Sequence, residues 1–512
     1  MKTCSPLALA AISGAAVCGS ACGQQKTPAR PNVVLIVADD LGYGDVSCYG
    51  SRTIMTPCLD SLAAAGVLFN NAYATSATSS PSRYAMFTGI YPWRADMRIL
   101  PGDAPLMIPV DMPTMPKMFQ ELGYATGAVG KWHLGMGEGY LDWNQPITPA
   151  ANTVGFDFTN IIPATVDRVP TVYVENGLVV GLDPDDPIKV SYKEPFPGEI
   201  TGKDHPELMT MPFHHGHNGT IINGIPRIGH MVGGKSALWD DATMADYFLG
   251  KSKNFIDEHA DEPFFLYYGL HEPHVPRTAM DRFAGSTEYG VRGDVIAEAD
   301  WLVGQIVSHL REKGLLDNTI IIFTSDNGPV VQDGYCDGSD EKIGDHDPNG
   351  GLRGGKYSLF DGGTHVPMIV YWPDAQGGKV SDEFVCQMDF WGSFAAMLGV
   401  ELPEGLDTRN TLEAFMGGKG GRTDQVIEAM GRLGLRDGDY VLMPPYNGPF
   451  SNETGNELGN LKDYGLYNLR SDKHQDVNLA GSQPELLEAI KAKFLQAVGK
   501  HYNPKREIEA LK

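Results

Sequence analysis

The sequence predicts an α/β fold: a large, doubly wound mixed sheet sandwiched by helices, with a small C-terminal α+β subdomain. Unbroken apolar runs rich in β-branched residues indicate strands that are buried on both faces. Segments with helical spacing alternate with these strands, which is typical of a doubly wound sheet. Near residue 420 the pattern changes to short alternating runs followed by one helix.

The predicted elements begin with a strand at 32–38, and Pro57 then precedes helical spacing over 58–69. The patterns further predict helix 114–122, strand 125–129, helix 242–259, strand 263–268, helix 291–315, strand 319–324 and strand 368–372. Residues 140–235 are rich in Pro, Gly and Asp and lack strong periodicity, so we expect a long excursion over the strand ends, where substrate would bind. The C-terminal subdomain should hold the runs 433–443 and 464–469 and helix 485–498.

The chain has 512 residues, of which 42% are hydrophobic, and this is enough for a large core. We expect a leader at 1–22, a main domain at 28–424 and the C-terminal subdomain at 425–512. The leader combines Lys2, a short apolar run and small residues near two cysteines, which predicts a signal peptide of secretory or lipoprotein type. We therefore expect a protein that is exported to the periplasm or lipid-anchored to the cell envelope. No other segment is long and apolar enough to be transmembrane.

The formal net charge of −24, with no basic stripe, argues against nucleic acid and anionic membranes as partners. An anionic substrate would therefore need a local positive patch or a metal site. The cysteines beyond the leader are scattered and fit no zinc pattern: Cys48, Cys58, Cys336 and Cys386. Burial as small apolar residues is favoured for them over a disulfide, although export would permit one.

Polar residues directly follow four of the predicted strands. In chain order they are Asp39-Asp40, Lys131-x-His133, His271-x-x-His274 and Asp326-Asn327. Because the carboxyl ends of strands in one open sheet converge, we expect these side chains to lie close together. The first and last pairs offer hard oxygen ligands, which suit calcium or magnesium but not a tetrahedral zinc site. Either pair alone is more typical of a turn, but their joint occurrence after buried strands indicates a metal site.

Residues 79–89 read Ser-Ser-Pro-Ser-Arg-Tyr-Ala-Met-Phe-Thr-Gly. This segment resembles the signature of the formylglycine-dependent (type I) sulfatases of the alkaline-phosphatase superfamily. That signature is Cys or Ser, any residue, Pro, a small residue, Arg, four residues and Thr-Gly. Ser79 stands at the modified position, as in bacterial carbohydrate sulfatases of the Ser type, and Phe87 stands where Leu is commoner. The segment also has the Ser and Pro residues of an ordinary helix start.

The resemblance extends over nearly all of the chain beyond the leader. Residues 130–135 match a second family signature, and residues 273–276 resemble its Pro-His-x-Pro segment. Gly355-Lys356 followed by Asp361-Gly-Gly resembles Gly-Lys followed by Glu-Gly-Gly, with Asp in place of Glu. Lys473-His474 departs from the usual Asp-Pro, far from the residues that carry the chemistry.

The resemblance implies an exo-acting enzyme that hydrolyses sulfate esters on sugars of host or algal glycans. It implies a formylglycine (3-oxoalanine) nucleophile made from Ser79 by a maturation enzyme, because a hydrated aldehyde can later release sulfate whereas a serine sulfate ester would be stable. It also implies one Ca2+ ion held by Asp39, Asp40, Asp326, Asn327 and the modified Ser79. The other implied catalytic side chains are Arg83 and Lys131 on the hydrated aldehyde, Lys131 and Lys356 on sulfate oxygens, His133 as proton acceptor and His274 as the acid for the leaving sugar oxygen.

Four more residues are candidates for substrate binding. His271 either touches sugar or packs, and His215, in the cluster 214–217, either lines the sugar pocket or lies in a solvated loop. Arg353 and His365 flank the Lys356 segment and are expected to bind sugar hydroxyls or a neighbouring carboxylate. Two alternative functions stay open: a phosphate or phosphonate ester hydrolase of the same superfamily, and a catalytically silent glycan-binding lipoprotein. The first usually needs a two-metal ligand set, and the second has no use for an acid and a base.

Overall fold

Ten strands form the central sheet of the computed structural model, which describes residues 30–373 and 375–505. The strand order is β15-β2-β14-β13-β1-β12-β4-β5-β6-β7; the strands from β13 to β5 run parallel, and β14 is antiparallel to β13. The bounds are β1 Asn32–Ala38, β2 Val67–Phe69, β4 Ala125–Lys131, β5 Phe158–Ile162, β6 Val174–Glu175, β7 Leu178–Val179, β12 Phe264–Gly269, β13 Thr319–Ser325, β14 Met368–Tyr371 and β15 Lys379–Ser381. The sheet is therefore mixed, and its parallel centre brings the ends of β1, β4, β12 and β13 to one edge. The predicted leader at 1–22 lies outside the described residues.

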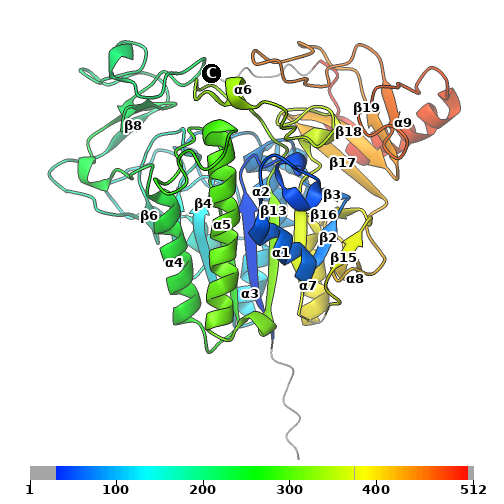
Figure 1. Cartoon of the computed structure of the whole chain (residues 1–512), viewed down its shortest axis with the longest axis horizontal. Helices are drawn as coiled ribbons and strands as arrows, with labels where there is room; N and C mark the ends of the chain where they lie inside the picture. The colour runs from blue at the N-terminus through cyan, green and yellow to red at the C-terminus, as the bar shows by residue number, and fades with distance from the viewer. Residues whose placement is uncertain (1–29, 374, 506–512) are drawn as a thin grey trace, which may run out of the picture. The chain divides into compact units, whose positions relative to one another are not determined.

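Helices cover both faces of this sheet (Figure 1). Side chains alternate along β1, so that Val33 and Leu35 belong to one apolar core and Val34 and Ile36 to another. The first core includes residues of α2 Ser79–Thr88, α3 Met115–Glu121, α7 Asp389–Leu398 and α8 Leu412–Phe415. The second includes residues of α1 Pro57–Ala65, α4 Met244–Glu258 and α5 Gly290–Glu312. The predicted sheet sandwiched by helices is confirmed.

A second, smaller sheet follows in the C-terminal part of the chain. Its antiparallel strands are β17 Asp424–Ala429, β18 Arg432–Asp437, β19 Tyr440–Met443 and β20 Gly465–Asn468, and α9 Pro484–Val498 packs on them. Phe494 of α9 is buried in one core with Leu433 and Leu442. The backbone N–H of Ala77 donates to the carbonyl of Glu428 at 2.8 Å. The turn between β17 and β18 is therefore tied to the segment that leads into α2.

One expectation about local structure was wrong, and short strands were missed in a second region. The helix predicted over 58–69 ends at Ala65, and after Gly66 the residues Val67–Phe69 form β2 and pair with β14. Residues 140–235 contain regular structure: β5 to β7 extend the main sheet, β8 Lys189–Ser191 pairs with β11 His230–Val232, and β9 Ile221–Ile222 pairs with β10 Ile225–Pro226. These strands were missed because short strands of mixed composition carry little periodicity.

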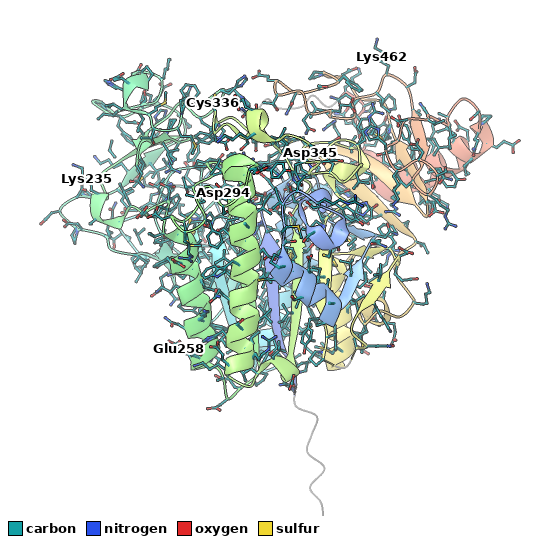
Figure 2. The ribbon with its side chains drawn as sticks, viewed as in Figure 1. Lys235, Glu258, Asp294, Cys336, Asp345 and Lys462 are labelled. Carbon is teal, nitrogen blue, oxygen red and sulfur yellow. The ribbon has the colours of Figure 1, made fainter. Side chains whose placement is uncertain are left out.

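The four cysteines of the described chain are free thiols. Cys386 is buried as expected, whereas Cys336 is exposed on a loop (Figure 2). Within the described residues, no helix has the length and apolar character needed to cross a membrane.

Candidate active site

Ser79 begins α2, a helix whose ten residues are all buried. The Lys131 ammonium donates to Ser79 Oγ at 2.8 Å. The same hydroxyl lies 3.2 Å from Asp39 Oδ1 and 3.3 Å from Asn327 Oδ1. Side chains that follow β1, β4 and β13 thus meet at the start of α2, where free backbone N–H groups favour an anion.

Three buried carboxylates face three buried cations around Ser79. The pairs and their N–O distances are Lys131–Asp39 2.6 Å, Arg83–Asp326 2.8 Å and Lys356–Asp40 2.8 Å. Buried charges of this kind persist only with partners of opposite sign. The local cationic groups that an acidic chain would need for an anionic substrate are therefore present at this point.

Burial and pairing shift the pKa values of these side chains in opposite directions. Burial raises the pKa of the Asp39 carboxyl. Burial would also raise the pKa of Asp326, but Arg83 and Lys131 hold it below its usual value. For Lys356 burial acts downward, yet Asp333 and neighbouring acids raise its pKa well above the ordinary value, so this ammonium stays charged.

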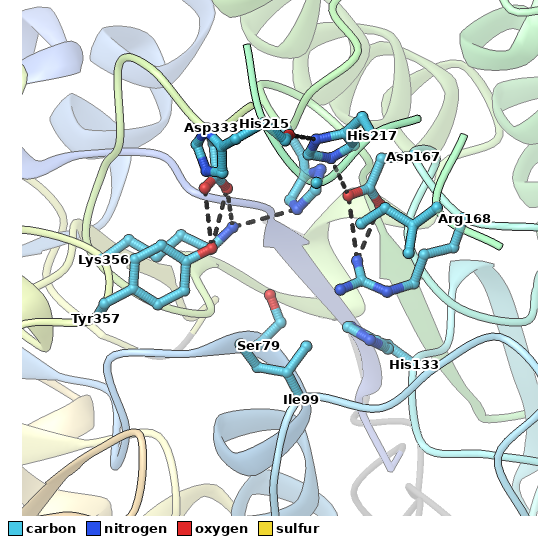
Figure 3. A pocket seen from close by; sticks show the side chains of 13 residues that line it. Ser79, Ile99, His133, Asp167, Arg168, His215, His217, Asp333, Lys356 and Tyr357 are labelled. Atoms are coloured by element: carbon cyan, nitrogen blue, oxygen red, sulfur yellow. Dashed lines mark hydrogen bonds and ion pairs between the residues drawn. The ribbon is translucent and has the colours of Figure 1, made fainter. Parts of the chain in front are cut away.

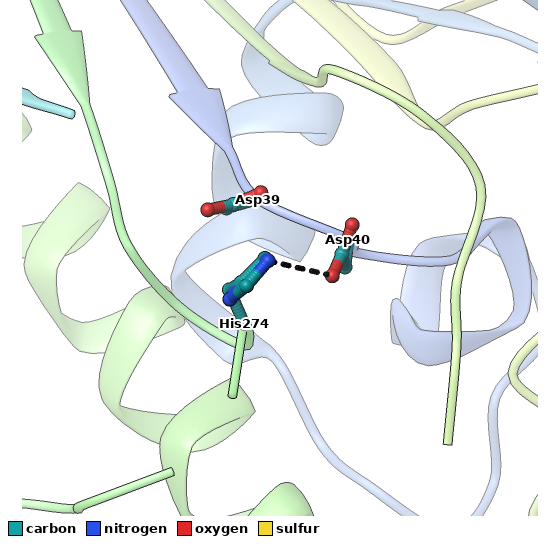
Figure 4. Close-up of side chains that lie close together, drawn as sticks. All are labelled: Asp39, Asp40 and His274. Atoms are coloured by element: carbon teal, nitrogen blue, oxygen red, sulfur yellow. Dashed lines mark ion pairs between the residues drawn. The ribbon is translucent and has the colours of Figure 1, made fainter. Parts of the chain in front are cut away.

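The oxygen ligands predicted for a metal ion are clustered. One oxygen each from Asp39 and Asp40 and a ring nitrogen of His274 lie within 4.8 Å of one another (Figure 4). Among the described residues, the buried Asp39 Oδ2 has no hydrogen-bond partner. The amide nitrogen of Asn327 donates to Asp40 Oδ1 at 2.8 Å, while its oxygen faces Ser79. A buried, oxygen-rich set with an unpaired carboxylate oxygen fits a hard cation such as calcium.

His133 is held as one tautomer. Its Nε2 lies 2.9 Å from the carbonyl of Leu100, which can only accept, so Nε2 carries the proton. Its Nδ1 is buried without a hydrogen-bond partner among the described residues. Burial lowers the pKa of this imidazole well below its usual value. A neutral ring with an unused lone pair is suited to accept a proton.

His274 and Lys356 form the opposite side of the site. His274 Nδ1 lies 2.6 Å from the carbonyl of Val275 and must donate to it, so Nε2 is the atom that faces the site. Lys356 Nζ lies 3.2 Å from this Nε2 and 2.8 Å from Asp333 Oδ2. Asp40 Oδ2 lies 3.7 Å from the same imidazole nitrogen. The Lys356 ammonium thus lies between two carboxylates, Asp40 and Asp333, and donates to His274 Nε2.

Three non-glycine residues at the site have left-handed backbones: Asp40 (φ 65°), His133 (φ 56°) and Tyr357 (φ 72°). Each such conformation costs about 1–3 kcal/mol and persists only where the surroundings enforce it. Strain of this kind is concentrated at functional sites, and here it aims polar side chains at one point.

A pocket opens above Ser79 (Figure 3). It is lined by Ser79, Ile99, His133, Asp167, Arg168, His215, Gly216, His217, Ile228, His274, Asp333, Lys356 and Tyr357. The structure therefore brings His215 and His217 of the predicted cluster to the pocket, together with four polar residues that the sequence patterns did not single out. These are Asp167, Arg168, Asp333 and Tyr357.

The newly identified residues form two hydrogen-bonded groups on the pocket wall. Asp167 Oδ1 pairs with Arg168 Nη1 at 3.0 Å, and its Oδ2 lies 3.0 Å from His217 Nε2. Burial would raise the pKa of Asp167, but Arg168 and the His217 hydrogen bond hold it well below its usual value. Tyr357 donates to Asp333, which also binds Lys356. Both groups present fixed donors and acceptors to whatever enters the pocket.

Three of the predicted sugar-binding residues do not line this pocket. His271 is buried beside Glu272, its Nε2 3.3 Å from Oε1, and burial lowers the pKa of its ring to about 4. His365 binds Asp361 at 2.7 Å, and Arg353 pairs with Glu457. For His365 and Arg353 the structure thus provides the neighbouring carboxylate that was the other expectation.

Comparisons with known proteins agree with this geometry. The sulfatase family model matches residues 31–400. An N-acetylgalactosamine-6-O-sulfatase of Bacteroides thetaiotaomicron is 47% identical over 476 residues, covering 92% of this chain and 93% of that protein, and human arylsulfatase A is 30% identical over 489 residues, covering 90% and 86%. A solved structure from work on glycosaminoglycan metabolism by Bacteroides thetaiotaomicron has a TM-score of 0.90 at 47% identity, covering 92% of this chain and 99% of that one. Ps i-CgsB in complex with k-i-k-neocarrahexaose has a TM-score of 0.67 at 26% identity, covering 94% and 95%.

Proposed function

Because this chain belongs to the sulfatase family, we propose that it hydrolyses a sulfate ester on a sugar, with N-acetylgalactosamine 6-sulfate as the sulfated residue. The observation that carries the reaction is the buried Ser79 hydroxyl, which Lys131 holds among cationic side chains below a pocket. The choice of sugar is supported by the 47% identical N-acetylgalactosamine-6-O-sulfatase. Sulfuric ester hydrolysis is the activity of the family. It is therefore favoured over the two alternative functions, a phosphonate ester hydrolase and a catalytically silent glycan binder.

The match at 79–89 supports modification of Ser79 to formylglycine. When formed, this group supplies a hydroxyl nucleophile in place of the weaker serine alcohol. Lys131 lies within hydrogen-bond distance of the residue 79 oxygen and would donate to it. Arg83 acts one step further away, since its Nε holds Asp326 at 2.9 Å and keeps that carboxylate beside the nucleophile.

Calcium fits the oxygen set of Asp39, Asp40, Asp326 and Asn327, and when bound it would polarise a sulfate oxygen at residue 79. The chain's own cations share that task. Lys131 contacts the residue 79 oxygen and Lys356 lines the pocket, so both can donate to sulfate oxygens, where negative charge gathers as the ester bond breaks.

Two imidazoles can move protons in this arrangement. His133 presents the unprotonated Nδ1, so it is suited to take a proton from residue 79. His274 keeps one proton on Nδ1 against Val275, so only a proton on Nε2 can pass to a leaving sugar oxygen. A sugar alkoxide leaves poorly without this proton, so the acid role falls to His274.

Protein from a host with the maturation enzyme should contain a residue 79 peptide lighter by two hydrogens. It should release sulfate from N-acetylgalactosamine 6-sulfate. Ser79→Ala should abolish turnover while the melting temperature stays within a few degrees of wild type. The matched control is Ser80→Ala, at the variable position of the motif, which should keep both the modification and turnover. An active preparation whose residue 79 is entirely unmodified would refute the nucleophile.

The leader at 1–22 supports export, either to the periplasm or to a lipid anchor. Fractionation of the native cells with and without globomycin-type inhibition of lipoprotein processing would separate these locations. Retention in the cytoplasm would contradict both.

A further inference from the structure

The segment that carries Lys356 has a strained backbone at the next residue. Tyr357 lines the pocket and is left-handed (φ 72°), a conformation that an aromatic residue keeps only where its surroundings enforce it. Its hydroxyl donates to Asp333 at 3.0 Å, and the Lys356 ammonium donates to the same carboxylate at 2.8 Å (Figure 3). Because the two residues are adjacent, whatever fixes the backbone of Tyr357 also fixes the point from which the Lys356 side chain starts.

Both backbone polar groups of Tyr357 are held by other parts of the chain. Its N–H donates to the carbonyl of Ala77, two residues before Ser79, at 2.9 Å. Its carbonyl accepts from Nη2 of Arg432 at 2.6 Å. Arg432 belongs to β18, so the C-terminal sheet provides one of these two contacts. Tyr357 is thereby fixed relative to the nucleophile on one side and to the C-terminal sheet on the other.

Arg432 is fully buried and joins three segments of the chain. Its other acceptors are the Ala429 carbonyl, 3.1 Å from Nε, and the Leu458 carbonyl and Asn460 Oδ1, 2.7 and 2.8 Å from Nη1. The Leu458 carbonyl also accepts from the N–H of Leu359 at 3.1 Å. One guanidinium thus connects the β17–β18 turn, a loop of the C-terminal part and the segment that holds Lys356. The planar fork of an arginine offers donors in enough fixed directions to do this.

A guanidinium is a costly group at this position. Its four acceptors are all uncharged oxygens, and burial lowers the pKa of Arg432 to about 10, so the group is still charged at neutral pH. Arg83 and Arg168, by contrast, each pair with an aspartate. Departures from the pairing of buried charges are concentrated where function requires them. The contact of Arg432 with the strained residue of the pocket gives such a reason.

We propose that Arg432 is a positioning residue for sulfate binding, which acts through the carbonyl of Tyr357 to hold the backbone that directs Lys356 into the pocket. The inference rests on the proposed function, in which Lys356 donates to sulfate. Arg432 is not among the residues that line the pocket, so it acts on the sulfate only through this segment. The C-terminal sheet then takes part in setting the affinity of the site for sulfate.

The test measures the Kd of the matured protein for inorganic sulfate by calorimetry, and kcat/KM on a sugar sulfate and an aryl sulfate. Arg432→Gln should raise the sulfate Kd about 10-fold and lower both kcat/KM values about 10-fold, the size of a lost hydrogen bond from a charged group. Arg432→Lys keeps the charge and some of the donors, so it should restore part of each loss. An unchanged sulfate Kd in Arg432→Gln, or a loss on the sugar sulfate alone, would overturn the proposal.

A double-mutant cycle separates positioning from general support of the fold. If Arg432 acts through Lys356, Arg432→Gln should change the sulfate Kd and kcat/KM by less than about twofold once Lys356→Ala is present. A full 10-fold loss in that background, on the order of the single-variant effect, would refute the proposal. If neither Arg432 variant folds, by circular dichroism and thermal melting, Arg432 serves the fold and its assignment to the site is wrong.

Arg436→Gln is the matched control on the same strand. Arg436 is also buried, and its Nε donates to the carbonyl of Gly438 at 3.0 Å, but its guanidinium stacks on Tyr73 and Phe384. This variant should lower the melting temperature and leave the sulfate Kd within about twofold of wild type. An equal rise of the Kd would show that any damage to β18 weakens the site, against the proposal. If wild type binds sulfate but hydrolyses neither ester, the proposed function fails, while the Kd comparison still tests Arg432.

Discussion

The floor of the pocket is Ser79 with the three carboxylate–cation pairs around it, and the wall is the set of side chains above it, such as Arg168. The two are built in different ways. At the floor, each buried carboxylate has a cation within 3 Å, and the carboxylates themselves follow β1 and β13. At the wall, the side chains come from loops and from a turn of the C-terminal sheet, and several are partly exposed. The floor presents the same charges to any sulfate ester. The wall contacts the part of the substrate that differs from one sulfate ester to another. Changes at the floor should therefore affect all sulfate esters, whereas changes at the wall should affect only sugar sulfates.

The largest expected effect concerns the floor. Removal of calcium by a chelator should abolish turnover of sugar and aryl sulfates alike, because the buried oxygens serve the sulfate common to both. Addition of calcium should restore it, and elemental analysis of the active protein should give one calcium per chain. The same protein should melt at a lower temperature without calcium, since a bound ion stabilises only the folded chain. Stoichiometric zinc in the active protein would contradict the oxygen site.

His274 lies at the boundary between floor and wall and should separate the two substrate types. His274→Ala should lower kcat on a sugar sulfate by about 10²–10⁴-fold, the usual range for a general acid. It should cost a nitrophenyl or nitrocatechol sulfate much less, because those groups leave as stable anions. Lys356→Ala is the comparison, and it should reduce both rates alike because it binds sulfate. Equal losses for His274→Ala would reassign His274 to sulfate binding.

Arg168 is the residue that tests the role of the pocket wall. It lines the pocket above Ser79 and is held by Asp167 at 3.0 Å. Arg168→Gln should raise KM for the sugar sulfate about 10-fold, as expected for a lost charged hydrogen bond, with little change in kcat. Kinetics on an aryl sulfate provide the reference and should change less than about threefold. A fall in kcat on both substrates would show that Arg168 acts on the sulfate group, as the floor residues do.

The sequence predicted the floor because its residues directly follow strong strands. Asp39-Asp40 and Asp326-Asn327 come after runs of apolar residues, so the topology alone brings them together. Asp167 and Arg168 follow β5, the neighbour of β4, but that strand is short and contains Thr and Asn, so no strand end was visible there. The position of Met430 close to residues 97–101 and Arg168 could not be predicted, because it depends on how the C-terminal sheet packs beside the main sheet. For Arg353 and His365 the sequence left open sugar hydroxyls or a neighbouring carboxylate, and the structure shows the carboxylates of Glu457 and Asp361.

The smallest expected effect on catalysis is at Arg353, which was predicted to bind sugar. Its guanidinium pairs with Glu457, donates to the Gln475 carbonyl at 2.9 Å and stacks on Phe360 at 4.1 Å. These contacts tie the loop that holds Arg353 to loops in the C-terminal part of the chain, so Arg353→Gln should lower the free energy of unfolding by about 1 kcal/mol, the size of one partly exposed polar contact. Its kcat/KM for sugar sulfates should stay within about twofold of wild type. Arg168→Gln is the comparison: it should raise KM for the sugar sulfate, and its melting temperature should also fall because the buried Asp167 loses its cation. If Arg353→Gln instead raised KM without loss of stability, the pocket wall would extend to the loop after Pro348, and the original assignment of Arg353 to sugar binding would be correct.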